Sequence, residues 1–103
     1  VAGSVVSRIH ALVMPQPEDD SFRVHLPDHV RVFKDLETAV KYAEKKARRL
    51  AIESASRAGA DDVRVQVERR DQHAPVNSEW GDEIYLQTLL DVTAIGRPRL
   101  AAR

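Results

Sequence analysis

The sequence predicts an α+β domain, a two-layer sandwich in which one long helix packs on a largely antiparallel sheet of four to five strands. Two observations carry this prediction. Apolar residues recur at helical spacing over residues 36–58, and segments of alternating apolar and polar residues lie on both sides of that helix. An amphipathic helix between half-buried strands covers one sheet face, so the expected order is β-β-β-α-β-β. The 103 residues suffice for a single domain.

Three strands are expected before the helix. Their predicted ranges are residues 5–14, 22–26 and 30–33. In the first strand, the face with Ile9, Ala11 and Val13 is the candidate core face. Residues 15–21 contain two prolines and an acidic run, which predict a surface loop.

The helix has recognisable ends and a stripe of small residues. Asp35 is the expected N-cap, because its carboxylate can accept hydrogen bonds from the first free N–H groups. Gly59 stands where a left-handed residue ends a helix. The predicted stripe consists of Leu36, Ala39, Val40, Ala43, Ala47, Leu50, Ala51, Ser54, Ala55 and Ala58. Its alanines allow close approach to a sheet, with Leu36, Val40 and Leu50 as the bulky contacts.

Two strands are expected after the helix. Residues 63–68 alternate strictly, residues 71–82 read as a loop that contains a proline and a glycine, and residues 83–95 form the last strand. The expected inner face of that strand comprises Ile84, Leu86, Leu90 and Val92. Residues 97–103 are expected to be a tail.

Charge excludes a generally basic binder. The chain carries 16 basic and 16 acidic residues, so we expect neither nucleic acid nor a membrane surface as a partner. The charge is unevenly placed, with seven basic and four acidic residues over 34–59 against three basic and eight acidic over 60–96. This polarity suits internal packing or a specific partner. The absence of cysteine excludes a disulfide scaffold and a thiolate metal site.

No catalytic, cofactor-binding or metal-binding residue is predicted. His25 and His29 have a zinc-helix spacing, but Pro27 between them prevents a shared helix face. The sequence has no glycine-rich phosphate loop and no nucleophile elbow. An enzyme site built from His10, His25 or His73 with carboxylates is a weaker interpretation that no spacing requires.

The candidate interaction surface consists of Trp80, Tyr85, Leu89, Arg97 and Arg99. A tryptophan in a polar loop often anchors a contact, and here it could equally cover the edge of the core. Tyr85 and Leu89 lie on the strand face opposite Ile84 and Leu86, so that face is a candidate for a partner. The basic tail with Arg97 and Arg99 is either a frayed end or a segment docked on another domain.

Several segments resemble the C-terminal part of hydantoinase/oxoprolinase family proteins. They are residues 1–6, 22–25, 33–37, 42–43, 58–63 and 93–100. The resemblance covers nearly the whole chain but includes no catalytic signature. It implies a parent similar to the ATP-dependent hydrolases of cyclic amides such as 5-oxoproline and hydantoins. The ATP and divalent-metal sites of such a parent would lie upstream, so no catalytic residue carries over to this chain.

Two hypotheses of function follow. The first is a non-catalytic C-terminal module of such an enzyme that serves packing, assembly or modulation of the catalytic core. Its partners would be upstream domains of its own chain in a cytoplasmic protein, with a homo-oligomer as a further possibility. The start at Val1 rather than methionine fits this expectation. The second hypothesis is a free-standing α+β interaction or dimerisation domain.

Overall fold

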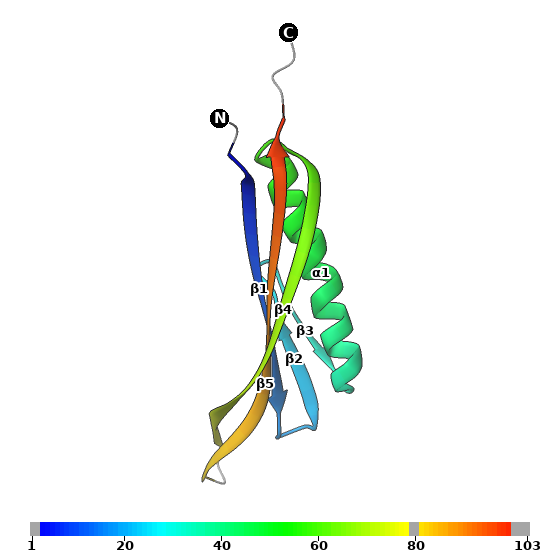
Figure 1. Ribbon diagram of the computed structural model, residues 1–103. Coiled ribbons are helices and arrows are strands. Elements are labelled where there is room, and N and C mark those ends of the chain that lie inside the picture. Colours follow the sequence, from blue (N-terminus) through cyan, green and yellow to red (C-terminus); the bar gives the residue numbers. More distant parts are fainter. Residues whose placement is uncertain (1–2, 79–80, 100–103) are drawn as a thin grey trace.

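The computed structural model describes residues 3–78 and 81–99 and confirms the α+β fold. One long helix packs on a five-stranded antiparallel sheet, in the predicted order (Figure 1). The elements are β1 (Val5–Gln16), β2 (Ser21–His25), β3 (Val30–Phe33), α1 (Leu36–Arg57), β4 (Ala60–Ser78) and β5 (Gly81–Pro98). No helix in these ranges is long and apolar enough to cross a membrane.

The sheet has the strand order β3-β2-β1-β5-β4. Its centre is the pair β1–β5, whose register runs from Val5 opposite Gly96 to Val13 opposite Thr88. β3 and β4 are therefore the two edge strands. Because side chains alternate along a strand, this register fixes which residues meet the helix and which form the open face of the sheet.

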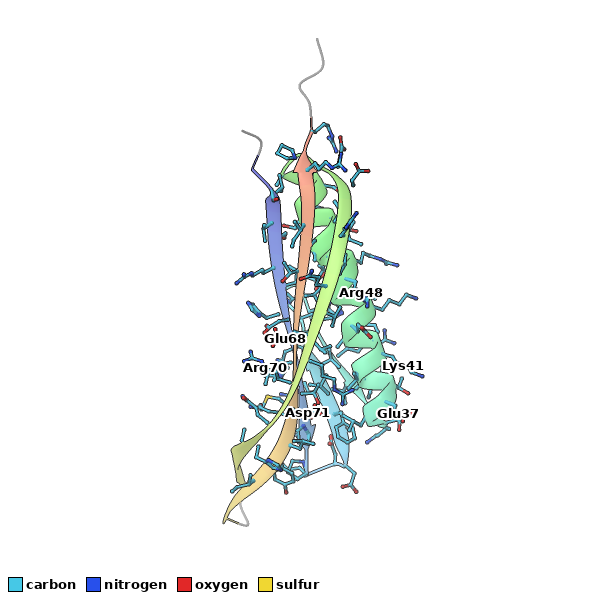
Figure 2. The ribbon with its side chains drawn as sticks, viewed as in Figure 1. Glu37, Lys41, Arg48, Glu68, Arg70 and Asp71 are labelled. Atoms are coloured by element: carbon cyan, nitrogen blue, oxygen red, sulfur yellow. The ribbon has the colours of Figure 1, made fainter. Side chains whose placement is uncertain are left out.

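The core lies between α1 and one face of the sheet. Alanines line the helix side at zero exposure, and branched side chains from the strands fill the space opposite them. Ala11 and Val13 of β1 are buried and Ile9 packs against them, which confirms the predicted core face. The outer face of α1 carries charged side chains such as Glu37, Lys41 and Arg48, which point away from the sheet (Figure 2).

Both predicted helix ends are confirmed. Asp35 accepts hydrogen bonds from the N–H and the hydroxyl of Thr38, each at 2.9 Å, which satisfies a donor that the helix leaves free. The bond from the N–H contributes most, and that from the hydroxyl next, to lowering the pKa of Asp35 below its ordinary value. Gly59 has a φ of 89°, the left-handed conformation expected after a helix.

The predicted loop over residues 71–82 is wrong. β4 continues to Ser78, and β5 begins at Gly81, so the two strands form one long hairpin. A proline and a glycine in this segment favour a loop, but an edge strand accepts a proline whose N–H would point away from the neighbouring strand. The hairpin also extends to Pro98, so the expected tail begins later than residue 97.

The loop predicted between the first two strands is also shorter than expected. Pro15 pairs with Phe22, and Gln16 pairs with Ser21, so only residues 17–20 form the turn. At Pro15, β1 has already passed the end of its pairing with β5, which stops at Val13. The missing N–H of the proline therefore costs no hydrogen bond to β5.

The helix is too short to cover the hairpin. Its 22 residues span about 33 Å at 1.5 Å per residue. The 19 residues of β4 span about 63 Å at 3.3 Å per residue. The molecule is accordingly elongated, 64 × 21 × 18 Å, and the turn end of the β4–β5 hairpin projects beyond the start of α1 (Figure 1).

Because the helix is shorter than the hairpin, several residues predicted to be buried are exposed. Ile84 and Leu86 share the face of Leu90 and Val92 as expected, but Ile84 is 70% exposed and Leu86 47% exposed. Leu36, expected as a bulky core contact, is 36% exposed because it lies at the uncovered end of the helix. Ser54 and Ala58 of the predicted stripe are exposed, whereas its six buried members are Ala39, Val40, Ala43, Ala47, Ala51 and Ala55.

Candidate interaction site

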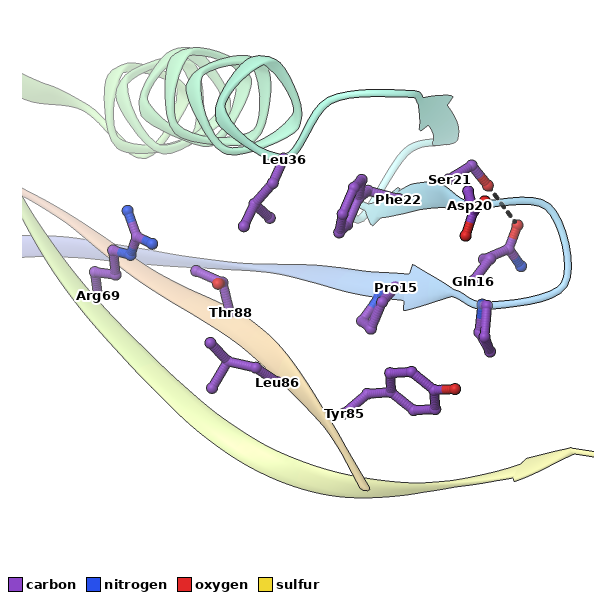
Figure 3. A pocket seen from close by; sticks show the side chains of 11 residues that line it. Pro15, Gln16, Asp20, Ser21, Phe22, Leu36, Arg69, Tyr85, Leu86 and Thr88 are labelled. Atoms are coloured by element: carbon purple, nitrogen blue, oxygen red, sulfur yellow. Dashed lines mark hydrogen bonds between the residues drawn. The ribbon is translucent and has the colours of Figure 1, made fainter. Parts of the chain in front are cut away.

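An apolar groove lies where the sheet extends past the first turn of the helix. It encloses about 640 Å³ between the β1–β2 hairpin, the start of α1 and the projecting part of β5 (Figure 3). Its lining residues are Pro15, Gln16, Pro17, Asp20, Ser21, Phe22, Leu36, Arg69, Tyr85, Leu86 and Thr88. A volume of this size is typical of a pocket for a ligand or for a few side chains of a partner.

Three apolar side chains from different elements form the walls of the groove. Phe22 from β2 and Leu36 from α1 stand on one side, and Leu86 from β5 lies across from them (Figure 3). Leu86 and the neighbouring Ile84 are among the exposed large apolar side chains of the described residues. An exposed apolar patch beside a concave surface is characteristic of an interaction site.

At one end of the groove, polar contacts hold the turn between β1 and β2. Ser21 is 1% exposed, and its hydroxyl hydrogen-bonds to the carboxylate of Asp19 and lies 3.4 Å from the side-chain amide of Gln16. The bond from Ser21 is the main reason that the pKa of Asp19 lies below its ordinary value. Lys34 also donates to the Asp19 carbonyl at 3.1 Å. These contacts fix Pro15 and Phe22 in place.

The opposite wall is fixed by Asp71 on β4. Thr88 is buried and donates from Oγ1 to Asp71 Oδ1 at 2.8 Å, and Arg69 Nε donates to the same oxygen at 3.3 Å. The bond from Thr88 lowers the pKa of Asp71, and Arg69 acts in the same direction. Asp71 is thus ionised and hydrogen-bonded at neutral pH. The contacts of Asp71 support the groove wall. Because they lower its pKa, Asp71 is not suited to act as a general acid, which needs a raised pKa.

The open face of the sheet is the second candidate surface. Leu12 of β1 lies opposite Leu89 of β5, and both are half-buried. One row further along, the Nδ1 of His10 donates to Asp91, and Arg70 Nη2 donates to the other Asp91 oxygen at 3.0 Å. The bond from His10 is the main cause that lowers the pKa of Asp91. This network is on the surface, since the His10 side chain is 75% exposed.

The structure separates the five residues predicted as an interaction surface. Tyr85 lines the groove, and Leu89 lies on the open sheet face as expected. Trp80 lies outside the described residues. Arg97 and Arg99 are at the far end of β5, away from the groove (Figure 1).

At that far end, the two arginines contact the acidic pair that follows the helix. Arg99 Nε is 3.2 Å from Asp61 Oδ1, and Arg97 Nε is 3.9 Å from Asp62 Oδ2. These side chains are more than half exposed, so each pair contributes little to stability. Arg97 and Asp62 also border a shallow polar hollow of about 620 Å³. Arg97 and Arg99 therefore lie apart from the groove, at the other end of β5.

The histidines do not converge. His25 is in β2, and His29 follows the turn, where its ring contacts Asp28 at 2.7 Å and the Tyr42 hydroxyl at 2.6 Å. Within the described ranges, no group of three His, Cys, Asp or Glu side chains could hold a metal ion.

Sequence reasoning missed most of the groove. The sequence predicts that residues 15–21 form a surface loop, and it predicts that Leu36 and Leu86 lie in the core. One signal could have found them: the apolar positions of the last strand extend beyond the length that a helix of 22 residues can cover.

Comparison with protein-family models, curated proteins and solved structures gives no match. The groove and the open sheet face are therefore interpreted from their own geometry and chemistry.

Proposed function

We propose that this chain is a non-catalytic assembly module of a longer protein, one that resembles the ATP-dependent hydrolases of cyclic amides. In this role the module docks another part of that protein, an upstream domain or a second subunit, in the groove beside the projecting hairpin. ATP and a divalent metal would be bound by the catalytic part of the parent. The observation that carries the proposal is the exposure of Ile84 and Leu86 at 70% and 47% next to the groove.

The geometry favours packing over chemistry at this place. The groove walls are mostly apolar, with Asp20 as the carboxylate among the lining residues. Two carboxylates beside the groove, Asp71 and Asp19, already accept hydrogen bonds from the lining residues Thr88 and Ser21. Their pKa values are lowered, whereas a general acid at neutral pH needs a raised one. Burying Leu86 against a partner would contribute about 1 kcal/mol, taking half of the value for full burial of a leucine.

The test uses Leu86→Asp in the full-length gene product that contains this chain. We expect the variant to lose subunits or interdomain contacts in analytical ultracentrifugation and limited proteolysis, while the isolated chain keeps its melting temperature because Leu86 is exposed. Ile52→Asp is the matched control, since Ile52 is 41% exposed on the helix and outside the groove. Equal assembly of both variants would refute docking at the groove.

Two results would refute the broader proposal. A reading frame that begins at Val1 would exclude a longer parent. Turnover of ATP, 5-oxoproline or hydantoin by the isolated chain at enzyme rates would exclude a non-catalytic module.

The second candidate function is a free-standing dimerisation domain that uses the open sheet face. The cross-strand pair Leu12–Leu89 favours it, because half-buried leucines on an uncovered face gain by further burial. Light scattering at several concentrations tests this function, with Leu89→Glu as the variant. A monomer at all concentrations would refute it.

A further inference from the structure

A third surface, apart from the groove and the open sheet face, lies along the edge strand β3. Within the described residues this strand pairs only with β2, so its outer side is free. Val30 and Val32 on this strand are 53% and 49% exposed. An edge strand with exposed β-branched residues is a template for pairing with another extended chain.

The hydrogen-bonding direction of β3 follows from its turn. The N–H of Leu26 donates to the carbonyl of His29 at 2.9 Å, so this pair is hydrogen-bonded. Hydrogen-bonded pairs alternate along an antiparallel ladder. Arg31 and Phe33, opposite Val24 and Phe22, therefore direct their backbone groups toward β2.

The alternate residues of β3, Val30 and Val32, consequently direct their N–H and C=O groups outward. Each presents one donor and one acceptor at the edge of the sheet. A partner strand can bond to all of these groups without disturbing the pairing between β3 and β2.

The side chains beside this edge are basic and lack acidic partners. The Arg31 guanidinium lies 4.9 Å from the centre of the Tyr42 ring and 5.2 Å from that of Phe33. Lys46 Nζ lies 5.6 Å from the same Tyr42 ring. Among the described residues, neither Arg31 nor Lys46 has an ion pair. Stacking thus fixes two cations on the helix side of β3, where they can bind an anion.

We propose that β3 binds an extended peptide segment in which acidic residues alternate with apolar ones. Residues opposite each other in a ladder share a sheet face. The acidic residues of the partner therefore meet Arg31 and Lys46 on the helix side. The apolar residues extend the row of Val30 and Val32 on the open side.

A second copy of the chain is a poorer occupant. Two-fold antiparallel pairing of β3 keeps the faces of both strands aligned, so the two Arg31 side chains meet on one face. It also brings together two helix segments that each carry seven basic and four acidic residues over 34–59. Repulsion between the two Arg31 side chains and between the two basic helices opposes this association.

The other edge of the sheet is less suited to pairing. β4 carries exposed charges of both signs at Arg64, Glu68 and Arg69, includes Pro75, and is irregular between Asp61 and Arg64. Charges, proline and bulges all protect edge strands from added strands.

The test uses fluorescence anisotropy of a labelled, capped peptide made of four Val-Glu repeats, titrated with the intact chain. Val32→Pro removes an outward N–H and leaves the ladder to β2 intact, so it should abolish binding. Arg31→Glu should weaken binding about tenfold, and added salt should weaken it further. Arg64→Glu changes the same charge on β4 and should leave binding unchanged.

Circular dichroism must show that each variant is folded, and amide shifts in NMR spectra should be confined to β3 and the adjoining part of α1. A peptide of the same composition with its glutamates in one block should not bind. Equal binding of the block peptide or of a single-stranded oligonucleotide would refute strand addition, because both lack the alternation. Unchanged binding by Val32→Pro, or peptide shifts at β4, would refute it as well.

Discussion

Gly96 lies where β5 passes close to the start of β4, and replacing it by alanine should destabilise the fold. A Cβ at this position would lie 2.7 Å from the Cβ of Ala60 and 2.9 Å from the carbonyl oxygen of Asp61. Carbon atoms in contact normally lie about 3.5–4.0 Å apart. The backbone oxygen belongs to the irregular segment between Asp61 and Arg64 and cannot rotate away as a side chain would.

The size of the effect follows from two opposing contributions. Overpacking a close-packed site costs about 2–3 kcal/mol, and the reduced freedom of the unfolded chain returns about 0.4–1 kcal/mol. The net loss of about 2 kcal/mol corresponds to a fall of roughly 8–16 °C in melting temperature for a domain of this size.

The assay is thermal unfolding followed by circular dichroism, with two other glycines as controls. Gly3→Ala should change the free energy of unfolding by less than about 0.5 kcal/mol, because a Cβ there meets nothing within 4 Å. Gly59→Ala meets no atom either, but its φ of 89° costs about 1 kcal/mol. Asparagine tolerates this conformation, so Gly59→Asn should destabilise the fold less than Gly59→Ala does. At position 96, asparagine should destabilise the fold at least as much as alanine. A Gly96→Ala protein as stable as Gly3→Ala would refute the close approach of the two strands.

Two further predictions concern the core and the open sheet face. Ala47→Leu should lower the free energy of unfolding in denaturant by about 1–3 kcal/mol, because Ala47 has zero exposure against the sheet. Ile52→Ala, at an exposed position, should lower it far less. Equal effects of the two substitutions would contradict the packing of α1. Asp91→Asn should flatten the loss of stability below about pH 4. The pKa of Asp91 is lower in the folded state than in the unfolded state. The stability that ionised Asp91 contributes is therefore complete above its pKa in the unfolded state, and it is lost as the pH falls through its pKa in the folded state. An unchanged acid limb in urea titrations at several pH values would refute this role.

The sequence sufficed to predict the layers of the fold because local signals agreed there. The alternation before the helix, the Asp35 cap and the left-handed Gly59 each depend on neighbouring residues alone. The inner and outer faces of β5 also followed from its alternation, which the register confirms.

The groove could not be predicted because it depends on lengths and on distant pairing. A proline usually ends a strand. β4 continues through Pro75 because β4 is an edge strand, which is known only from the order of strands in the sheet. Leu86 is apolar and correctly oriented, yet its exposure is set by where the helix begins at Leu36. Neither fact is contained in a short window of sequence.

The central pairing of β1 with β5 has a mechanical consequence. Val5 lies opposite Gly96, and the two strands run antiparallel from there, so β1 begins and β5 ends at the same end of the domain (Figure 1). Within the β1–β5 ladder, tension applied to the two strands at this end would load the Val5–Gly96 pair first and then separate the pairs one at a time. In this geometry the hydrogen bonds break successively rather than together. A pull on its ends would therefore open this module at low force, starting at the end opposite the groove.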